Sequence, residues 1–122
     1  MILADTTIWI DHFRLENMEM RRQLDNGNIV IHPFVIAELA LGSLRNREKT
    51  LAWLDLLPRT RVAQIGEVRQ MIEMRSLFCR GIGLIDAHLI ASVFIHPFTL
   101  LWTKDKRLCE IAGEFGVAAK LP

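Results

Sequence analysis

The chain opens with Met1-Ile2-Leu3-Ala4-Asp5-Thr6-Thr7-Ile8-Trp9-Ile10, and this stretch decides the fold. Its second to fourth residues are apolar and are cut off by an acid and two threonines. The pattern predicts a short buried strand with Asp5 at its carboxyl end. Thr6 or Thr7 can cap the helix that follows, which we expect to continue to about Arg14. The opening therefore predicts a strand–helix unit with a carboxylate at the turn between them.

The rest of the chain repeats this alternation. Further strands are predicted at Ile29–Ile31, Arg61–Ala63, Thr99–Trp102 and Val117–Ala119. Pro33 suits the first position of a helix, which Phe34 to Leu44 continue. Further helices are predicted at Met18–Asp25, at Glu48–Leu57, at Glu67–Arg80, from Ile85 or Asp86 to about Phe94, and at Lys106–Phe115. Strands that alternate with helices indicate a parallel sheet covered on both faces. We therefore expect an α/β fold, with one domain over residues 1–122 and a mostly parallel central sheet flanked by helices.

Composition excludes several classes of protein. The chain has 122 residues, of which 51% are hydrophobic and 24% charged, and its net charge is +1. That charge is too small for a polybasic nucleic-acid binder or an acidic tail protein, although it leaves room for a local basic patch. Cys79 and Cys109 cannot make a disulfide framework or a four-ligand zinc site. Neither a transmembrane run nor a signal peptide is recognisable, so we expect a soluble, cytoplasmic protein.

Three carboxylates stand alone inside apolar runs. Asp5 interrupts the opening segment, Glu38 is the only charge within residues 33–44, and Asp86 is the only acid within residues 81–97. Burying an ionised carboxylate without a partner costs several kcal/mol. No arginine or lysine is spaced to pair locally with Glu38 or Asp86. These acids therefore need a partner from elsewhere.

A fourth acid, Asp105, closely follows the predicted strand Thr99–Trp102. Parallel sheets place ligand sites at the carboxyl ends of their strands, where Asp5, Glu38, Asp86 and Asp105 can converge. Four carboxylates in one pocket repel one another, and a divalent cation relieves that repulsion. Oxygen ligands without cysteine or a histidine pair favour Mg²⁺ or Mn²⁺ over zinc.

Other interpretations remain open for each acid taken alone. Asp86 can be a helix N-cap, and Asp5 and Asp105 can be turn residues. A non-enzymatic binding module would use its acids in this way. A receiver-like phosphoacceptor domain would also place acids and Mg²⁺ at strand ends, but it usually has adjacent acids after its first strand, where only Asp5 stands. Glu38 is the hardest to explain as structure, and the coincidence of all four acids favours a metal site.

Four segments follow one another in order along nearly the whole chain: Leu3–Ile10, His32–Leu39, Gly81–Leu89 and Leu101–Leu108. Together they resemble the PIN-domain ribonucleases, and more narrowly the VapC-type toxins of prokaryotic toxin–antitoxin pairs. The resemblance implies that Asp5, Glu38, Asp86 and Asp105 form an acidic quartet that holds Mg²⁺. It also implies that Thr7 is the small hydroxyl residue near the first acid. Asp5 and Asp86 are the best candidates for direct ligands.

The resemblance further implies an activity and partners. The activity is Mg²⁺-dependent endonucleolytic cleavage of RNA, the cognate partner is a VapB-like antitoxin, and the toxin is a homodimer. RNA requires positive charge near its phosphates, and Lys104 and Arg107 flank Asp105, so both are candidates for substrate binding. The cluster Arg45, Arg47 and Lys49 is interpreted as solvated surface charge.

Overall fold

Three short strands form the centre of the computed structural model, which describes all 122 residues. They are β1 (Ile2–Ala4), β2 (Ile29–Val30) and β3 (Leu100–Trp102), and they lie in the order β2-β1-β3. Both pairings are parallel, with Ile2 of β1 opposite Ile29 on one side and Leu100 on the other. The predicted parallel sheet is confirmed.

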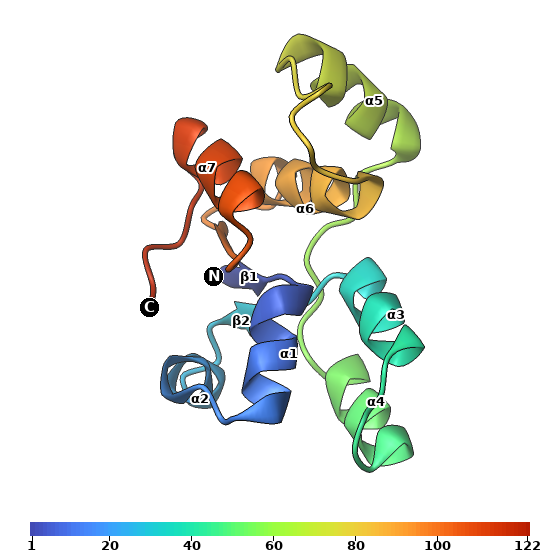
Figure 1. Ribbon diagram of the computed structural model, residues 1–122, viewed down its shortest axis with the longest axis vertical. Helices are drawn as coiled ribbons and strands as arrows, with labels where there is room; N and C mark the ends of the chain where they lie inside the picture. Colours follow the sequence, from blue (N-terminus) through green and yellow to red (C-terminus); the bar gives the residue numbers. More distant parts are fainter.

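Seven helices surround the sheet (Figure 1). They are α1 (Thr6–Arg14), α2 (Met18–Asp25), α3 (Pro33–Leu41), α4 (Arg47–Asp55), α5 (Ile65–Met74), α6 (Leu84–Ile95) and α7 (Lys106–Glu114). In Figure 1, α1 and α2 lie on one side of the strands and α6 and α7 on the other, with α3 and α4 beside α1. The α/β class and the flanking helices agree with the prediction. None of these helices has the length and apolar character needed to cross a membrane.

Side-chain caps fix where the helices at the sheet edge begin. Asp5 accepts a hydrogen bond of 3.2 Å from the backbone N of Ile8 at the start of α1. Asp105 accepts one of 2.9 Å from the N of Leu108 at the start of α7. Both acids are therefore N-caps, and this interpretation is compatible with a second role. Asp86 is not a cap, because α6 begins after Gly83 and Asp86 lies inside its first turn.

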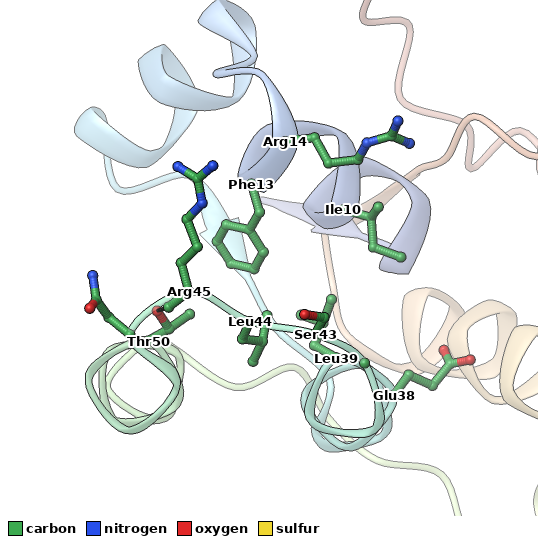
Figure 2. Close-up of a pocket in the computed structure, with 11 residues that line it drawn as sticks. Ile10, Phe13, Arg14, Glu38, Leu39, Ser43, Leu44, Arg45 and Thr50 are labelled. Atoms are coloured by element: carbon green, nitrogen blue, oxygen red, sulfur yellow. Dashed lines mark hydrogen bonds between the residues drawn. The ribbon is translucent and has the colours of Figure 1, made fainter.

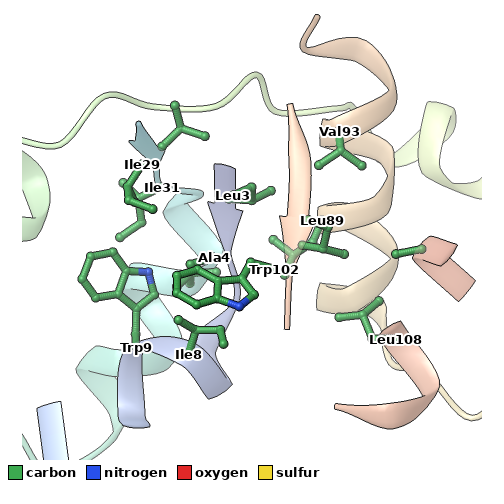
Figure 3. Close-up of a cluster of buried hydrophobic side chains, with 14 of the residues drawn as sticks. Leu3, Ala4, Ile8, Trp9, Ile29, Ile31, Leu89, Val93, Trp102 and Leu108 are labelled. Carbon is green, nitrogen blue, oxygen red and sulfur yellow. The ribbon is translucent and has the colours of Figure 1, made fainter. Parts of the chain in front are cut away.

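Buried side chains of the strands and helices pack together in one hydrophobic core (Figure 3). Leu3 and Ala4 of β1, Trp9 of α1, and Trp102 of β3 are at most 2% exposed. Residues 87–93 of α6 are all buried, as its almost uniformly apolar sequence predicts. Burial of an aromatic or branched side chain contributes about 1.5–3 kcal/mol, so the carboxyl ends of β1 and β3 are firmly placed.

Two predicted strands are not formed. Residues 61–63 form no strand. Ile31, which follows β2, pairs instead with Arg59 through a single parallel bridge. The backbone then turns away, and the Arg61 side chain donates to the carbonyl of Ile95 at the end of α6. Residues 117–119 contribute only one bridge, between Ala118 and Leu101.

Two predicted helices end earlier than expected by three residues or more. The helix predicted to reach Leu44 ends at Leu41, where the guanidinium of Arg47 donates to the carbonyls of Ala40 and Gly42. Those carbonyls would otherwise lack partners at the helix end. The helix predicted to reach Arg80 ends at Met74. Ser76 and Cys79 beyond it have φ of 52° and 61°, which a right-handed helix does not allow.

Candidate active site

Asp5 is the most deeply buried acid of the chain, with 4% of its surface exposed. It lies at the carboxyl end of β1, and its backbone N donates to the carbonyl of Trp102 in β3. Burial raises the pKa of Asp5, and hydrogen bonds from Thr103, Thr7 and Ile8 act against that rise. The carboxyl group is thus held in an apolar setting by a small number of directed donors.

Two threonine hydroxyls orient the Asp5 carboxyl group. Thr7 Oγ1 donates to Oδ1 at 2.5 Å, and Thr103 Oγ1 donates to Oδ2 at 2.5 Å. Each hydroxyl in turn accepts a backbone N–H, from Lys104 at 2.9 Å and from Asp105 at 3.0 Å respectively. The segment that follows β3 is therefore linked to the start of α1 through one carboxyl group.

Glu38 reaches the same edge from α3. It is half-buried, and its Oε1 accepts a hydrogen bond of 2.7 Å from Thr6 Oγ1, the first residue of α1. Thr6 and Glu38 are 32 residues apart, so this contact depends on the packing of α1 against α3. It places Glu38 next to the residue that follows Asp5.

The pKa of Asp86 is affected by the negative charges of the other three acids. Burial raises its pKa, and the negative charges of Asp5, Asp105 and Glu38 raise it further, in that order. None of the four carboxylates forms an ion pair with an arginine, a lysine or a histidine. The structure therefore brings the four predicted acids into electrostatic contact and gives them no cationic side chain of their own.

The arrangement suits a divalent cation in its donor chemistry, although the side chains are too far apart to bind one without moving. No three acidic, histidine or cysteine side chains lie close enough together to hold a metal ion as they stand. The donor chemistry fits Mg²⁺ or Mn²⁺, since every candidate ligand is a carboxylate oxygen. The raised pKa of Asp86 has the sign expected for acids that gather without a counter-charge. The four carboxylates thus have the donor chemistry that Mg²⁺ or Mn²⁺ requires, and their side chains must rotate to bring the oxygens close enough to bind the ion.

The two cations predicted to bind substrate already have partners. Lys104 Nζ lies 2.7 Å from Asp11 Oδ2 in an exposed ion pair. The Arg107 guanidinium donates to the carbonyl of Gly81 at 3.5 Å, in the loop before α6. Both stand near the acids, and their role in RNA binding stays a prediction.

A cavity of about 790 Å³ adjoins Glu38 (Figure 2). It lies between α1, α3 and the segment that leads into α4, and Ile10, Phe13, Arg14 and Arg45 contribute to its walls. Residues 45–64 lie outside the four segments that carry the family resemblance. Their part in a cavity beside an acid of the site emerges only from the tertiary structure.

Sequence reasoning missed two hydroxyls at the site, those of Thr6 and Thr103. Thr6 was considered only as a helix cap, and Thr103 had no assigned role. The available signal was position, because each follows a strand directly or by one residue at the edge where parallel sheets bind ligands. Thr7 was found, and the structure gives it a definite contact to Asp5.

Comparison with known proteins agrees with this geometry. The family model of the PIN domain matches residues 2–114. The chain is 41% identical over 118 residues to "Ribonuclease VapC32" of Mycobacterium tuberculosis, in the sequences from strain CDC 1551 / Oshkosh and strain ATCC 25618 / H37Rv. Each match covers 97% of this chain and 95% of the relative. The PIN match replaces the receiver-like alternative and confirms the resemblance seen in the four segments. A family model that spans nearly the whole chain, together with this identity, shows that the chain belongs to the PIN-domain family, in its VapC-type branch.

Proposed function

We propose that the protein is the toxin of a type II toxin–antitoxin pair and acts as a Mg²⁺-dependent endoribonuclease. The observation that carries the proposal is the gathering of four acids, none of which has a cationic partner, at one edge of the sheet. Burial, and then the charges of the other three acids, raise the pKa of Asp86 in agreement with this arrangement. Membership of the VapC-type branch, whose enzymes are typically metal-dependent, gives this charge cluster its chemical meaning. The relative's name specifies a ribonuclease, and RNA is accordingly the proposed substrate.

Asp5 and Asp86 are proposed as direct ligands of the cation, and Glu38 and Asp105 complete its surroundings. The chemistry supplied by a bound divalent cation is Lewis-acid activation of water and of the scissile phosphate. Thr7 and Thr103 hold the two Asp5 oxygens in place, so that they need not reorganise when the cation and the RNA bind. Thr6 does the same for Glu38, which stands at the side of the site that opens to the cavity.

The proposal is tested by incubating purified protein with total RNA in Mg²⁺ and in EDTA. We expect cleavage in Mg²⁺ only, with activity lost in Asp5→Asn and Asp86→Asn. Glu73→Gln, which neutralises an exposed acid of α5, is the matched control and should cleave like the wild type. Equal cleavage by the wild type and by Asp5→Asn would identify a contaminating nuclease and overturn the proposal.

The proposed partners are a VapB-like antitoxin and a second copy of the toxin. A basic antitoxin segment would complement four carboxylates without cationic partners. Size-exclusion chromatography with light scattering should show a dimer of the free toxin, and co-expression with the antitoxin should inhibit cleavage. A monodisperse monomer at tens of micromolar, a rough test range for modest affinity, would contradict the dimer.

A further inference from the structure

The cavity beside Glu38 combines apolar and cationic walls (Figure 2). Phe13 and Arg14 at the end of α1 form one side, and Arg45 in the segment before α4 forms another. In Figure 2, Glu38 lies at one end of this lining and Arg45 at the other. At about 790 Å³, the cavity falls within the usual size range of ligand pockets, roughly 300–1,000 Å³.

Its two arginines are unusual in this chain because they have no partners. Of the eleven arginines, eight form an ion pair, donate a hydrogen bond or stack on a ring: Arg21, Arg22, Arg47, Arg59, Arg61, Arg75, Arg80 and Arg107. Only Arg14, Arg45 and Arg69 do none of these. Two of the three line the same cavity. Their guanidinium groups are therefore available for an anionic ligand.

Phe13 supplies a surface for stacking. Its ring lies 5.7 Å from the ring of the buried Trp9, which fixes it from within the core. Figure 2 shows its side chain projecting from α1 into the cavity, between Ile10 and Arg45. A fixed aromatic ring beside free guanidinium groups is the combination that binds single-stranded nucleic acid, through base stacking and phosphate contacts.

We propose that this cavity binds a nucleotide of single-stranded RNA that neighbours the scissile phosphodiester. Phe13 stacks on its base, and Arg14 and Arg45 contact the flanking phosphates. Glu38 borders both the cavity and the acid cluster, so the RNA strand can continue from one into the other. The inference rests on the proposed ribonuclease function and adds to it a substrate subsite.

Charge decides between RNA and a protein segment as occupant. A basic antitoxin segment that suits the carboxylates would be repelled by Arg14 and Arg45, whereas RNA phosphates would be attracted to both. The cavity and the acid cluster therefore differ in the ligand charge that they favour. RNA suits both regions, because a divalent cation would bridge its phosphates to the acid cluster and the two arginines would attract its phosphates at the cavity.

The test measures RNA affinity in the Asp86→Asn background, which is expected to bind without cleaving. A fluorescein-labelled ten-nucleotide single-stranded RNA of mixed sequence is titrated in Mg²⁺ at several salt concentrations, with fluorescence anisotropy as the readout. We expect Arg14→Ala/Arg45→Ala to weaken binding at least tenfold. It should also reduce the slope of log affinity against log salt by about 1.4, since each phosphate contact on a single strand contributes roughly 0.7. Arg69→Ala removes an equally free arginine from α5 and should change neither quantity.

Phe13→Leu separates stacking from charge. We expect it to weaken binding at least about fivefold without changing the salt slope, because stacking is not an ionic contact. In the catalytically intact protein, Arg14→Ala/Arg45→Ala should raise the half-saturating RNA concentration and leave the single-turnover rate at saturation within about twofold. Both arginines are exposed and their side chains form no ion pair or hydrogen bond, so folding is expected to survive, and circular dichroism checks it.

The outcomes separate this inference from the proposed function. If the wild type cleaves RNA and Arg14→Ala/Arg45→Ala binds RNA like Arg69→Ala, the subsite is refuted and the ribonuclease proposal stands. Loss of antitoxin inhibition in that same variant, with RNA affinity intact, would assign the cavity to the antitoxin and also refute the subsite. If the wild type neither binds nor cleaves RNA, both proposals fail together.

Discussion

Thr103 donates a 2.5 Å hydrogen bond from Oγ1 to Oδ2 of Asp5, which stands 98 residues earlier in the chain. The same hydroxyl accepts the backbone N–H of Asp105 at 3.0 Å. One side chain thereby joins the acid after β1 to the acid after β3. This relationship depends on the parallel pairing of the two strands, which places their carboxyl ends side by side.

Thr103→Val is expected to lower the rate of RNA cleavage by about 10- to 100-fold, the usual cost of removing a group that orients a metal ligand. Valine keeps the branched shape and removes the donor to Asp5. Thr103→Ser keeps the hydroxyl and should retain most activity. Single-turnover cleavage at saturating Mg²⁺ measures both variants. Equal rates for valine and serine would show that the Thr103 hydroxyl does not position Asp5.

Asp86→Asn is expected to raise the melting temperature in EDTA by a few degrees, since about 1 kcal/mol corresponds to roughly 4 °C for a domain of this size. The raised pKa of Asp86 means that folding disfavours its charge, and the other acids contribute to that cost. The cost is absent in acid and fully present once the pH exceeds the raised pKa. The gain should therefore appear at neutral pH and vanish as the pH falls below the ordinary pKa of Asp86.

The same variant should lose the stabilisation that Mg²⁺ gives the wild type, because a ligand that binds only the folded state stabilises by mass action. Thermal melts in EDTA and in millimolar Mg²⁺ supply both comparisons. Exposed Glu73→Gln is the control for a general change in charge. A wild type that is insensitive to Mg²⁺, together with no gain for Asp86→Asn in EDTA, would contradict a shared acidic site.

The fold should lose stability in acid through His32. Burial, with a smaller contribution from the charge of His88, lowers the pKa of His32 to about 4. Its Nδ1 accepts the N–H of Phe34, and its Nε2 is buried without a partner. Because the folded state resists protonation, stability is complete above pH 6.5 and falls as the pH drops from there to 4. The total loss is roughly 3 kcal/mol.

Urea unfolding at a series of pH values measures that loss. His32→Asn keeps an acceptor for the cap at Phe34 and removes the titrating ring, so its stability should depend less steeply on pH between 6.5 and 4. The comparison uses slopes, because the smaller side chain lowers stability at every pH. Identical slopes in the two proteins would assign the acid sensitivity to other groups.

Gly81 and Arg107 are expected to be energetically coupled. Gly81 has φ of +81°, and a Cβ there would lie 2.5 Å from the Arg107 guanidinium, which must then move. Alanine at positive φ costs about 1–2 kcal/mol. Gly116→Ala carries only that cost, because nothing lies within 4 Å of its Cβ position. Gly81→Ala should therefore destabilise the protein more than Gly116→Ala.

A double-mutant cycle with Arg107→Ala tests the contact itself. Once the arginine is removed, Gly81→Ala should cost no more than Gly116→Ala does. Urea unfolding should give a coupling energy of about 0.5–3 kcal/mol, the range for residues in contact. Additive effects would show that Arg107 moves aside without cost and contributes nothing to the loop before α6.

Local chemistry explains why much of this protein was predictable from its sequence. Ile2–Ala4 forms the central strand because a short apolar run ended by Asp5 and Thr6 leaves few alternatives. Pro33 correctly marked the first residue of α3, whereas the cap of α1 is Asp5 and not Thr6 or Thr7 as predicted. Asp5, Glu38 and Asp86 were identifiable because a charge inside an apolar run needs a partner from elsewhere in the chain. Asp105 was identifiable by its position just after a predicted strand, at the edge where parallel sheets bind ligands. Each of these signals operates within a few residues.

The tertiary structure decided what depends on contacts between distant segments. Arg61–Ala63 is not a strand, because Ile31 at the sheet edge pairs with Arg59 instead. Tertiary packing determines which residues pair with the edge of a sheet. Thr103 meets Asp5, and Arg14 and Arg45 border one cavity, only after the strands and helices are in place. The sequence by itself determined which residues carry charge and where the main elements begin. The packing of helices on a parallel sheet decided which of those residues share a site, because proximity across dozens of residues leaves no local trace.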